Sequence, residues 1–517
     1  MKVLSSYVCG AWKRGDGAAQ VLVNPATEEP LAETSTKGLD LAAALAFARD
    51  RGGPGLRGLT FAERGDVLRA MSRVIHQHRD HLLDVAIESG GVTRSDAKFD
   101  VDGASGTLAF YADLGKELGA RKWLADGDTV LLGRSPRFVG QHLLLPRRGV
   151  AVHINAFNFP AWGFGEKAAC ALLAGMPVFV KPATSTAILA HRIFELLIEA
   201  KLAPEGALSL LTGAAGDLVD QLRGEDVLSF TGGGSTATTL RSAQPVVRDS
   251  VRVNVEADSL NAAILGADVE VGSDTWGAFL RDVARDMTQK TGQKCTAIRR
   301  VFVPRDHVAG VVEELIERLK AVVTGNPKAD GVTMGPVATA SQLRDVRAGI
   351  DLLKAESKMV LGDGPFDPVG APAGKGFYVQ PTLFVQESAA AAKAAHAHEV
   401  FGPAATVFAY DDTEAAASEV RRGGGGLVSS VYADDKKLAA ELVLGVGSAH
   451  GRVVAISAKI VDQAPGPGTV LPQSIHGGPG RAGGGEELGG LRGLGFYSQR
   501  VAVHGDRPFI DGLTGAK

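Results

Sequence analysis

A cysteine near the middle of the chain has neighbours that suit covalent chemistry. Cys295 follows Lys294 directly, and Arg299 and Arg300 come shortly after it, just before an apolar stretch. The thiolate is the reactive form of cysteine, and nearby cations lower the pKa of a thiol. We therefore expect a lowered pKa at Cys295 and a nucleophile that lies just before a strand. The alternative is an inert, half-buried thiol, which is the commoner state of an isolated cysteine.

A carboxylate and an amide upstream favour the reactive interpretation. Glu256 lies shortly before the apolar run 262–265, and Asn158 lies between the strand-like stretch 150–154 and a predicted helix. An asparagine amide in that position can donate a hydrogen bond to a developing oxyanion, which is worth roughly 10²–10³ in rate. The alternative is that Asn158 only caps the following helix.

A glycine-rich turn and a lysine suit a phosphate-bearing ligand. Thr231, Gly232 and Gly233 follow the predicted strand 226–230 and precede a helical stretch. Backbone N–H groups at such a turn can hold a pyrophosphate. The spacing does not match G-x-G-x-x-G, so the glycines alone are weak support. Lys181 ends another predicted strand and adds a positive charge.

The elements that position these residues alternate between strands and helices. Residues 40–118 have apolar side chains every three or four positions and predict several antiparallel helices. Residues 149–255 predict βαβ units and therefore a parallel sheet. Ligands of such sheets bind at the carboxyl ends of the strands. Lys181, Gly213 and Gly232 all lie at predicted strand ends.

Two stretches depart from this alternation. Residues 121–148 predict a β-hairpin, which we expect to pack against another part such as a partner subunit. A second α/β unit runs over residues 256–490, and its last part, residues 465–490, is rich in glycine. This part is either a low-complexity linker or a tight functional loop.

Composition limits the classes of partner. A chain of 517 residues is too long for one core and suggests two or three domains. A net charge of -3 and a pI of about 6.5 give no reason to expect nucleic acid or an anionic membrane. The start of the chain lacks a signal peptide, and the longest apolar run, residues 168–180, is too short to span a bilayer. Three cysteines in so long a chain indicate a reducing compartment, so we expect a cytoplasmic protein.

Taken together, these stretches resemble the aldehyde dehydrogenase superfamily over almost the whole chain. The matching motifs lie, in order, at residues 157–160 (asparagine), 180–183 (cofactor lysine), 230–232 (phosphate turn), 255–257 (glutamate), 292–296 (cysteine), 334–336, 380–382 and 399–403. Two departures are that Asp258 and Ser259 replace the two glycines after the glutamate motif, and that Phe157 stands where tryptophan is common.

The resemblance implies an α/β fold with a Rossmann-type cofactor domain, an α/β catalytic domain and a small bridging β element. It implies a dinucleotide-binding domain at residues 1–122 and 149–255 and a catalytic domain at residues 256–490. Residues 123–148 and 491–517 form the bridging element of an expected homodimer. The resemblance implies no metal site.

The family mechanism implies a role for each polar residue. Cys295 adds to the aldehyde carbon, and the Asn158 amide and the Cys295 backbone N–H hold the oxyanion. Hydride passes to the nicotinamide and leaves a thioester on Cys295, and Glu256 acts as general base on the water that releases the acid.

The expected cofactor is NADP, with NAD as a weaker substitute. Relatives that prefer NAD have a glutamate three residues after the strand-end lysine, and here that position is Thr184, followed by Ser185. A threonine can donate a hydrogen bond to the 2′-phosphate, with Lys181 near it for charge. By resemblance, Glu399 holds the nicotinamide ribose and Phe401 packs near the nicotinamide. The other expected cofactor contacts are Gly213, Thr231, Gly232 and Gly233.

Three stretches are similar to a subgroup that oxidises CoA-linked semialdehydes formed in aerobic benzoyl-CoA and phenylacetyl-CoA degradation. They are residues 256–261, 294–300 and 476–490. The phenylacetate version continues into a hydratase domain, whereas this chain stops at Lys517, so the expected substrate is 3,4-dehydroadipyl-CoA semialdehyde.

Two alternatives stay open. One is a CoA-acylating aldehyde dehydrogenase, in which free CoA instead of water resolves the thioester. Such enzymes generally lack the glutamate base, so Glu256 counts against this alternative. The other is a non-catalytic binding protein on the same fold, which retention of Cys295, Glu256, Asn158 and Lys181 together makes improbable.

Overall fold

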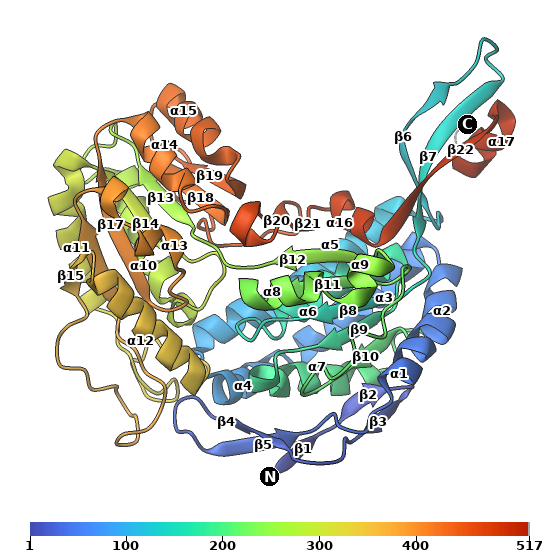
Figure 1. Cartoon of the computed structure of the whole chain (residues 1–517), viewed down its shortest axis with the longest axis horizontal. Coiled ribbons are helices and arrows are strands. Elements are labelled where there is room, and N and C mark those ends of the chain that lie inside the picture. Colours follow the sequence, from blue (N-terminus) through green and yellow to red (C-terminus); the bar gives the residue numbers. More distant parts are fainter. Residues whose placement is uncertain (515–517) are drawn as a thin grey trace.

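The computed structural model describes residues 1–514 and has two α/β lobes that lie side by side (Figure 1). Within these residues, a seven-stranded sheet forms the centre of each lobe. A three-stranded antiparallel sheet projects as an arm from the lobe that contains the N-terminus (Figure 1). The predicted α/β fold is therefore confirmed.

The first sheet has the strand order β12-β11-β8-β9-β10-β2-β3. Its strands are β12 (Arg252–Glu256), β11 (Val227–Thr231), β8 (Ala151–Ile154), β9 (Val178–Lys181), β10 (Leu208–Leu210), β2 (Ser6–Val8) and β3 (Ala11–Lys13). The first five run parallel, whereas β2 and β3 add as an antiparallel edge. Thr231 pairs with Glu256 in register, and Ile154 pairs with Lys181, so their side chains start from the same edge of the sheet.

Helices cover both faces of this sheet (Figure 1). They are α1 (Leu41–Phe47), α2 (Gly53–Gly58), α3 (Phe61–Gln77), α4 (Arg79–Gly90), α5 (Arg94–Leu118), α6 (Trp162–Ala174), α7 (Ala187–Glu199), α8 (Gly234–Arg241) and α9 (Gln244–Arg248). The first five confirm the helices predicted over residues 40–118. Helix α6 is apolar on nearly every side and is buried under α5, with Cys170 in the core as its apolar surroundings predict.

The second sheet has the order β15-β16-β17-β14-β13-β18-β19. Its strands are β15 (Lys358–Leu361), β16 (Thr382–Gln386), β17 (Ala404–Tyr410), β14 (Arg300–Pro304), β13 (Ala262–Leu265), β18 (Gly426–Tyr432) and β19 (His450–Ile456). Only β15 is antiparallel to its neighbour. The helices of this lobe include α10 (Asp274–Thr288), α11 (Val308–Lys320), α12 (Ala340–Lys354), α13 (Ala394–Ala397), α14 (Thr413–Arg421) and α15 (Lys436–Gly447). Helix α12 ends at Lys354, and Lys358 begins an edge strand.

The arm consists of β6 (Leu124–Leu131), β7 (Phe138–Pro146) and β22 (Ser498–Asp506), followed by α17 (Arg507–Thr514). The first two strands confirm the predicted hairpin. The third pairs with β7 along its whole length, from Ser498 opposite Pro146 to Asp506 opposite Phe138. Residues 515–517 of the predicted bridging element lie outside the described part. Its role in a homodimer stays a prediction.

The glycine-rich stretch forms an ordered crossing between the lobes rather than a linker. It contains the strand pair β20 (Ile475–Gly477) and β21 (Glu486–Leu488) and leads into α16 (Leu491–Phe496). A Cβ added to Gly483 or Gly485 would come within 2.4 Å of the Val255 carbonyl oxygen, so this loop can lie against β12 only where side chains are missing.

The other described strands, β1 (Lys2–Leu4), β4 (Gln20–Val23) and β5 (Pro30–Thr34), form a small sheet at the N-terminus. No helix within residues 1–514 is long and apolar enough to cross a membrane.

Candidate active site

The backbone before Cys295 follows an unusual path. After α10 ends, Lys290 and Thr291 have positive φ values of 52° and 58°, and Gly292 follows at 68°. Left-handed conformations at non-glycine residues are rare and cost free energy, so surrounding contacts must hold them. A Cβ on Gly292 would lie 2.2 Å from the Gly402 carbonyl oxygen, which leaves glycine as the residue that fits.

Two of the three cations near Cys295 in the sequence, Lys294 and Arg300, point elsewhere in space, and the third, Arg299, is paired with Glu399 at 3.3 Å. Lys294 donates to Asp286 at 2.6 Å and to Gln289 at 2.9 Å, so its ammonium supports the end of α10. Arg300 is buried and donates to backbone carbonyl oxygens, including that of Leu260 at 2.7 Å. The expected lowering of the thiol pKa is therefore wrong.

Burial is the main influence on the thiol. It raises the pKa of Cys295 well above its ordinary value, and the negative charge of Glu256 raises it further. The side chain is nevertheless half-buried, so one side of it faces a cavity. At neutral pH, Cys295 is consequently a protonated thiol beside a carboxylate.

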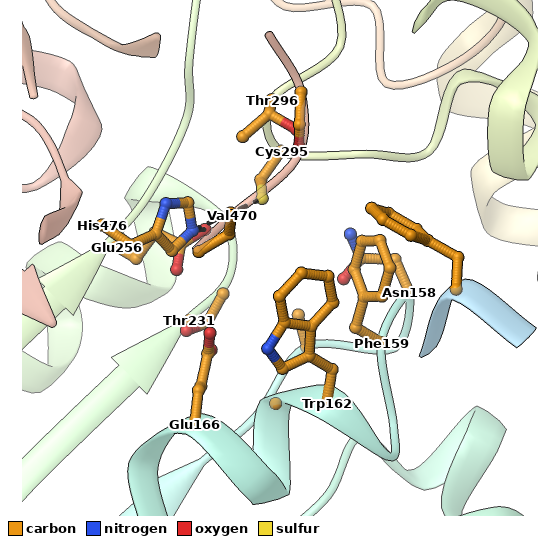
Figure 2. Close-up of a pocket in the computed structure, with 14 residues that line it drawn as sticks. Asn158, Phe159, Trp162, Glu166, Thr231, Glu256, Cys295, Thr296, Val470 and His476 are labelled. Atoms are coloured by element: carbon orange, nitrogen blue, oxygen red, sulfur yellow. Dashed lines mark hydrogen bonds and ion pairs between the residues drawn. The ribbon is translucent and has the colours of Figure 1, made fainter. Parts of the chain in front are cut away.

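The thiol, the carboxylate and the amide meet although they are far apart in the sequence (Figure 2). Cys295 lies in the loop before β14, Glu256 ends β12, and Asn158 lies in the loop between β8 and α6. All three line one cavity. The Asn158 amide carries two N–H donors and directs one at the Gln293 carbonyl oxygen, 3.0 Å away. The other can serve an oxyanion on the same side as Cys295.

Sequence reasoning missed His476 as a site residue. Its Nε2 lies 3.3 Å from Oε1 of Glu256 and 3.8 Å from Sγ of Cys295. Burial opposes the charge of His476, but Glu256 outweighs burial and raises the pKa of the imidazole. The available signal was a lone histidine inside the glycine-rich stretch, where no periodicity indicates which way a side chain points.

The surroundings of Glu256 keep its carboxylate ionised. Burial favours its neutral form, yet His476 and Lys167 lower the pKa of Glu256 to about 2. Lys167 is buried and lies 2.9 Å from Glu166 and 3.1 Å from Glu487. Burial and the nearby Glu487 raise the pKa of Glu166 to about 7, against the opposite influence of Lys167. Sequence reasoning did not identify these three residues. Glu166 and Lys167 lie in a helix whose pattern indicates a core element, and Glu487 lies in the glycine-rich stretch, which has no periodicity.

A second, larger groove of about 1420 Å³ meets the inner cavity at the thiol. The residues that line both are Ala156, Asn158, Thr231, Glu256 and Cys295. The predicted cofactor residues that line this groove are Lys181, Thr184, Thr231, Gly232, Gly233, Glu399 and Phe401. Cys295 therefore lies where two ligands could approach it, one in each space.

Two predicted cofactor residues are not among those lining this groove within residues 1–514. Ser185 follows Thr184 in a short 3₁₀ turn and is partly exposed. Gly213 is buried with φ +112°, and a Cβ there would lie 3.1 Å from the side chain of Thr36. The structure therefore explains Gly213 by packing against the N-terminal segment.

The chemistry of the groove fits a dinucleotide. The amide of Asn155 and the hydroxyl of Thr231 line it, and their polar atoms are buried without a hydrogen-bond partner in the described chain. Such atoms cost free energy unless a ligand satisfies them. Burial lowers the pKa of Lys181 to about 8, which an anionic ligand would reverse. At the start of α8, the Gly234 N–H already donates to Asp258 at 3.0 Å, so one amide there has an anionic partner within the chain.

Glu399 and Phe401 reach the groove from the second lobe. Glu399 accepts from the Ser259 N–H at 2.8 Å and lies 3.3 Å from Arg299. Burial raises its pKa to about 7 despite the arginine. Phe401 packs edge-on against Phe157, with ring centroids 5.8 Å apart. These contacts join both lobes across the groove.

Comparisons with known proteins agree with this geometry. The model of the aldehyde dehydrogenase family matches residues 12–497. The chain is 45% identical over 477 residues to 3,4-dehydroadipyl-CoA semialdehyde dehydrogenase of Aromatoleum evansii, covering 92% of this chain and 93% of the relative.

Solved structures match the fold at lower identity. The NAD+ complex of aldehyde dehydrogenase from Bacillus cereus has a TM-score of 0.85 at 21% identity, covering 98% of this chain and 97% of that one. Lactaldehyde dehydrogenase from Escherichia coli has a TM-score of 0.84 at 23% identity, covering 98% and 99%.

The charge next to the thiol predicts how Cys295 reacts with iodoacetamide as pH changes. Glu256→Gln removes a negative charge that raises the thiol pKa. The pH at which the alkylation rate reaches half its maximum should therefore fall by at least about one pH unit. Mass spectrometry of the Cys295 peptide measures the rate. Glu414→Gln, at an exposed carboxylate on α14, is the control and should leave the midpoint in place. An unchanged or higher midpoint in Glu256→Gln would contradict this account of the thiol.

Proposed function

The chain belongs to the aldehyde dehydrogenase family, and we propose that it oxidises an aldehyde to a carboxylic acid through a thioester on Cys295, with NADP as the cofactor. The observation that carries this proposal is the meeting of thiol, carboxylate and amide at the junction of two cavities. One cavity would take the aldehyde, and the other fits a dinucleotide.

The charges of the apo site suit attack by Cys295 on an aldehyde carbon. The thiol is protonated at rest, and the ionised Glu256 is within hydrogen-bond reach of it, so the carboxylate can accept the proton as the C–S bond forms. The free N–H of Asn158 can then stabilise the oxyanion of the thiohemiacetal. In this step Glu256 acts on the proton of the thiol, and Asn158 acts on the oxygen of the aldehyde that has become bonded to Cys295.

The residues that would hold the cofactor are those of the larger groove, notably Lys181, Thr184 and Glu399. When bound, its nicotinamide supplies a hydride acceptor. Loss of hydride from the thiohemiacetal leaves a thioester on Cys295. Once Glu256 has released the thiol proton to solvent, a water beside it can lose a proton to the carboxylate and attack the thioester. The C–S bond then breaks, and the acid and the free thiol of Cys295 are released. A positioned base of this kind is worth about 10²–10⁴ in rate.

The ionised Glu256 also favours water over free CoA as the group that resolves the thioester. Glu256 is ionised, so it can accept a proton from water, and its negative charge repels an approaching thiolate. The acylating alternative needs no such base. We therefore propose a carboxylic acid as product.

The proposed substrate is 3,4-dehydroadipyl-CoA semialdehyde, on the basis of the 45% identical relative. The shape of the inner cavity supports a long substrate. Phe99, Trp162 and Val470 line both this cavity and an open outer groove of about 1100 Å³. An aldehyde tail could pass between them while a bulky CoA group stays in the outer groove, which also carries Lys98.

The substrate proposal predicts a large difference in catalytic efficiency between aldehydes. We expect kcat/KM for the CoA-linked semialdehyde to exceed that for a short aliphatic aldehyde by at least about 100-fold, because contacts remote from the reacting carbon raise kcat/KM. The assay follows NADPH absorbance with and without free CoA. Free CoA should leave the rate unchanged and should yield no new thioester product. Equal efficiencies would refute the substrate, and a strict requirement for free CoA would favour the acylating alternative.

The cofactor proposal predicts the behaviour of substitutions at Thr184. Thr184→Glu places a carboxylate in the groove, where it would repel a 2′-phosphate, so the ratio of kcat/KM for NADP over NAD should fall at least about tenfold. Thr184→Val removes only the hydroxyl and should lower the ratio less. Steady-state rates with both cofactors measure it. An unchanged ratio in Thr184→Glu would rule out Thr184 as the determinant.

A further inference from the structure

Three different metal-binding groups converge on one point of the inner cavity. They are the thiol of Cys295, Nε2 of His476 and the carboxylate of Glu256, whose ligand atoms all lie within 4.8 Å of one another. Figure 2 shows the thiol of Cys295 next to the His476–Glu256 pair, all in the lining of the same cavity. They come from the loop before β14, from β20 and from the end of β12, so three separate elements fix their positions.

Two of the separations are close to the edges of a tetrahedral zinc site. Zinc bonds of about 2.3 Å to sulfur and about 2.0–2.1 Å to nitrogen or oxygen place a sulfur and a nitrogen ligand about 3.5 Å apart, and a nitrogen and an oxygen ligand about 3.3 Å apart. The observed separations are 3.8 Å from Sγ of Cys295 to Nε2 of His476, and 3.3 Å from Nε2 to Oε1 of Glu256. A zinc ion would need only a small movement of the thiol.

The surroundings of the trio favour a dication. The side chains of His476 and Glu256 are 4% and 3% exposed, so the ion would be largely shielded from water. Oxygen atoms of Glu166 and Glu487 lie within 4.8 Å of the Glu256 carboxylate, and Lys167 is the cation paired with both. Two carboxylates thus lie next to Glu256, against Lys167 beside them and Arg452 near His476.

The fourth position of such a site would face the cavity. Cys295 and His476 line the cavity together with Glu256, so a water or an aldehyde oxygen could complete the coordination. Three protein ligands and one open position are usual for zinc in a cavity. Sequence spacing did not reveal the trio, because the three residues are spread over 221 positions, from 256 to 476.

We propose that Cys295, His476 and Glu256 form an inhibitory zinc site. On binding, the thiol and the imidazolium of His476 each release a proton to solvent, and the thiolate, the imidazole nitrogen and a carboxylate oxygen bond to the metal. A single ion then occupies both the proposed nucleophile and the proposed base. Zinc would thus switch off the oxidation reversibly, without changing the fold.

This proposal goes beyond the proposed function, since the zinc takes no part in the oxidation. It can also be tested without turnover, so failure of the dehydrogenase assay and failure of the metal site are separate results.

Cobalt(II) is the spectroscopic probe, because it binds the same ligands as zinc in tetrahedral geometry. Unlike zinc, it has absorption bands that depend on which ligands it has. Titration of the full-length protein with cobalt(II) should reach saturation at one bound cobalt ion per chain. The bound cobalt should show an intense visible band and a thiolate-to-cobalt band in the near ultraviolet. One equivalent of zinc should remove both bands. Cys9→Ser, a change of the other half-buried cysteine, is the matched control and should keep both bands. Cys295→Ser should lose the near-ultraviolet band, and His476→Phe should bind at least about 100-fold more weakly.

Protection from alkylation tests the same site in the unsubstituted protein, so it does not depend on the folding of a variant. Zinc should slow the reaction of Cys295 with iodoacetamide at least tenfold and leave the reaction of Cys9 unchanged, and a chelator should restore the rate and the dehydrogenase activity together. Cobalt bound without a thiolate band, or an equal rate at Cys295 with and without zinc, would overturn the proposal.

Discussion

The amide of Asn261 makes the contact on which the site depends. Its Nδ2 donates to the carbonyl oxygens of Cys295 and Ala297, both at 2.8 Å, and its Oδ1 accepts from the Val428 N–H at 3.0 Å. The residue is fully buried at the start of β13, five positions after Glu256. The Asn261 side chain thus fixes the loop that contains Cys295 to the second sheet. It also fixes this loop to the segment that follows β12 of the first sheet.

This constraint explains why a costly backbone persists before Cys295. Lys290 and Thr291 hold left-handed conformations because the loop is tied at both ends. Asn261 holds the end after the cysteine, whereas the Thr291 hydroxyl donates to the Gly335 carbonyl oxygen at 2.9 Å on the other side. A buried amide with all its partners satisfied tolerates little change, since loss of one partner leaves another polar group unpaired. The two sheets can therefore present a thiol and a carboxylate to each other at a fixed separation.

The general architecture could be predicted from sequence, because helical and strand periodicities are local properties. Cys295, Glu256 and Asn158 were also identified correctly as neighbours, through motifs that occur in order along the chain. The thiol pKa was predicted wrongly because the direction of Lys294 depends on Asp286, in the last turn of α10, and not on distance along the chain. His476 was missed because a glycine-rich loop gives no periodic signal.

The most direct test of the central claim is the mass of the enzyme trapped between oxidation and hydrolysis. Glu256→Gln, mixed with the semialdehyde and NADP and quenched within one turnover, should gain the mass of one acyl group on the Cys295 peptide, and hydroxylamine should remove it. Formation of NADPH with no adduct, or an adduct on a peptide other than that of Cys295, would contradict the account.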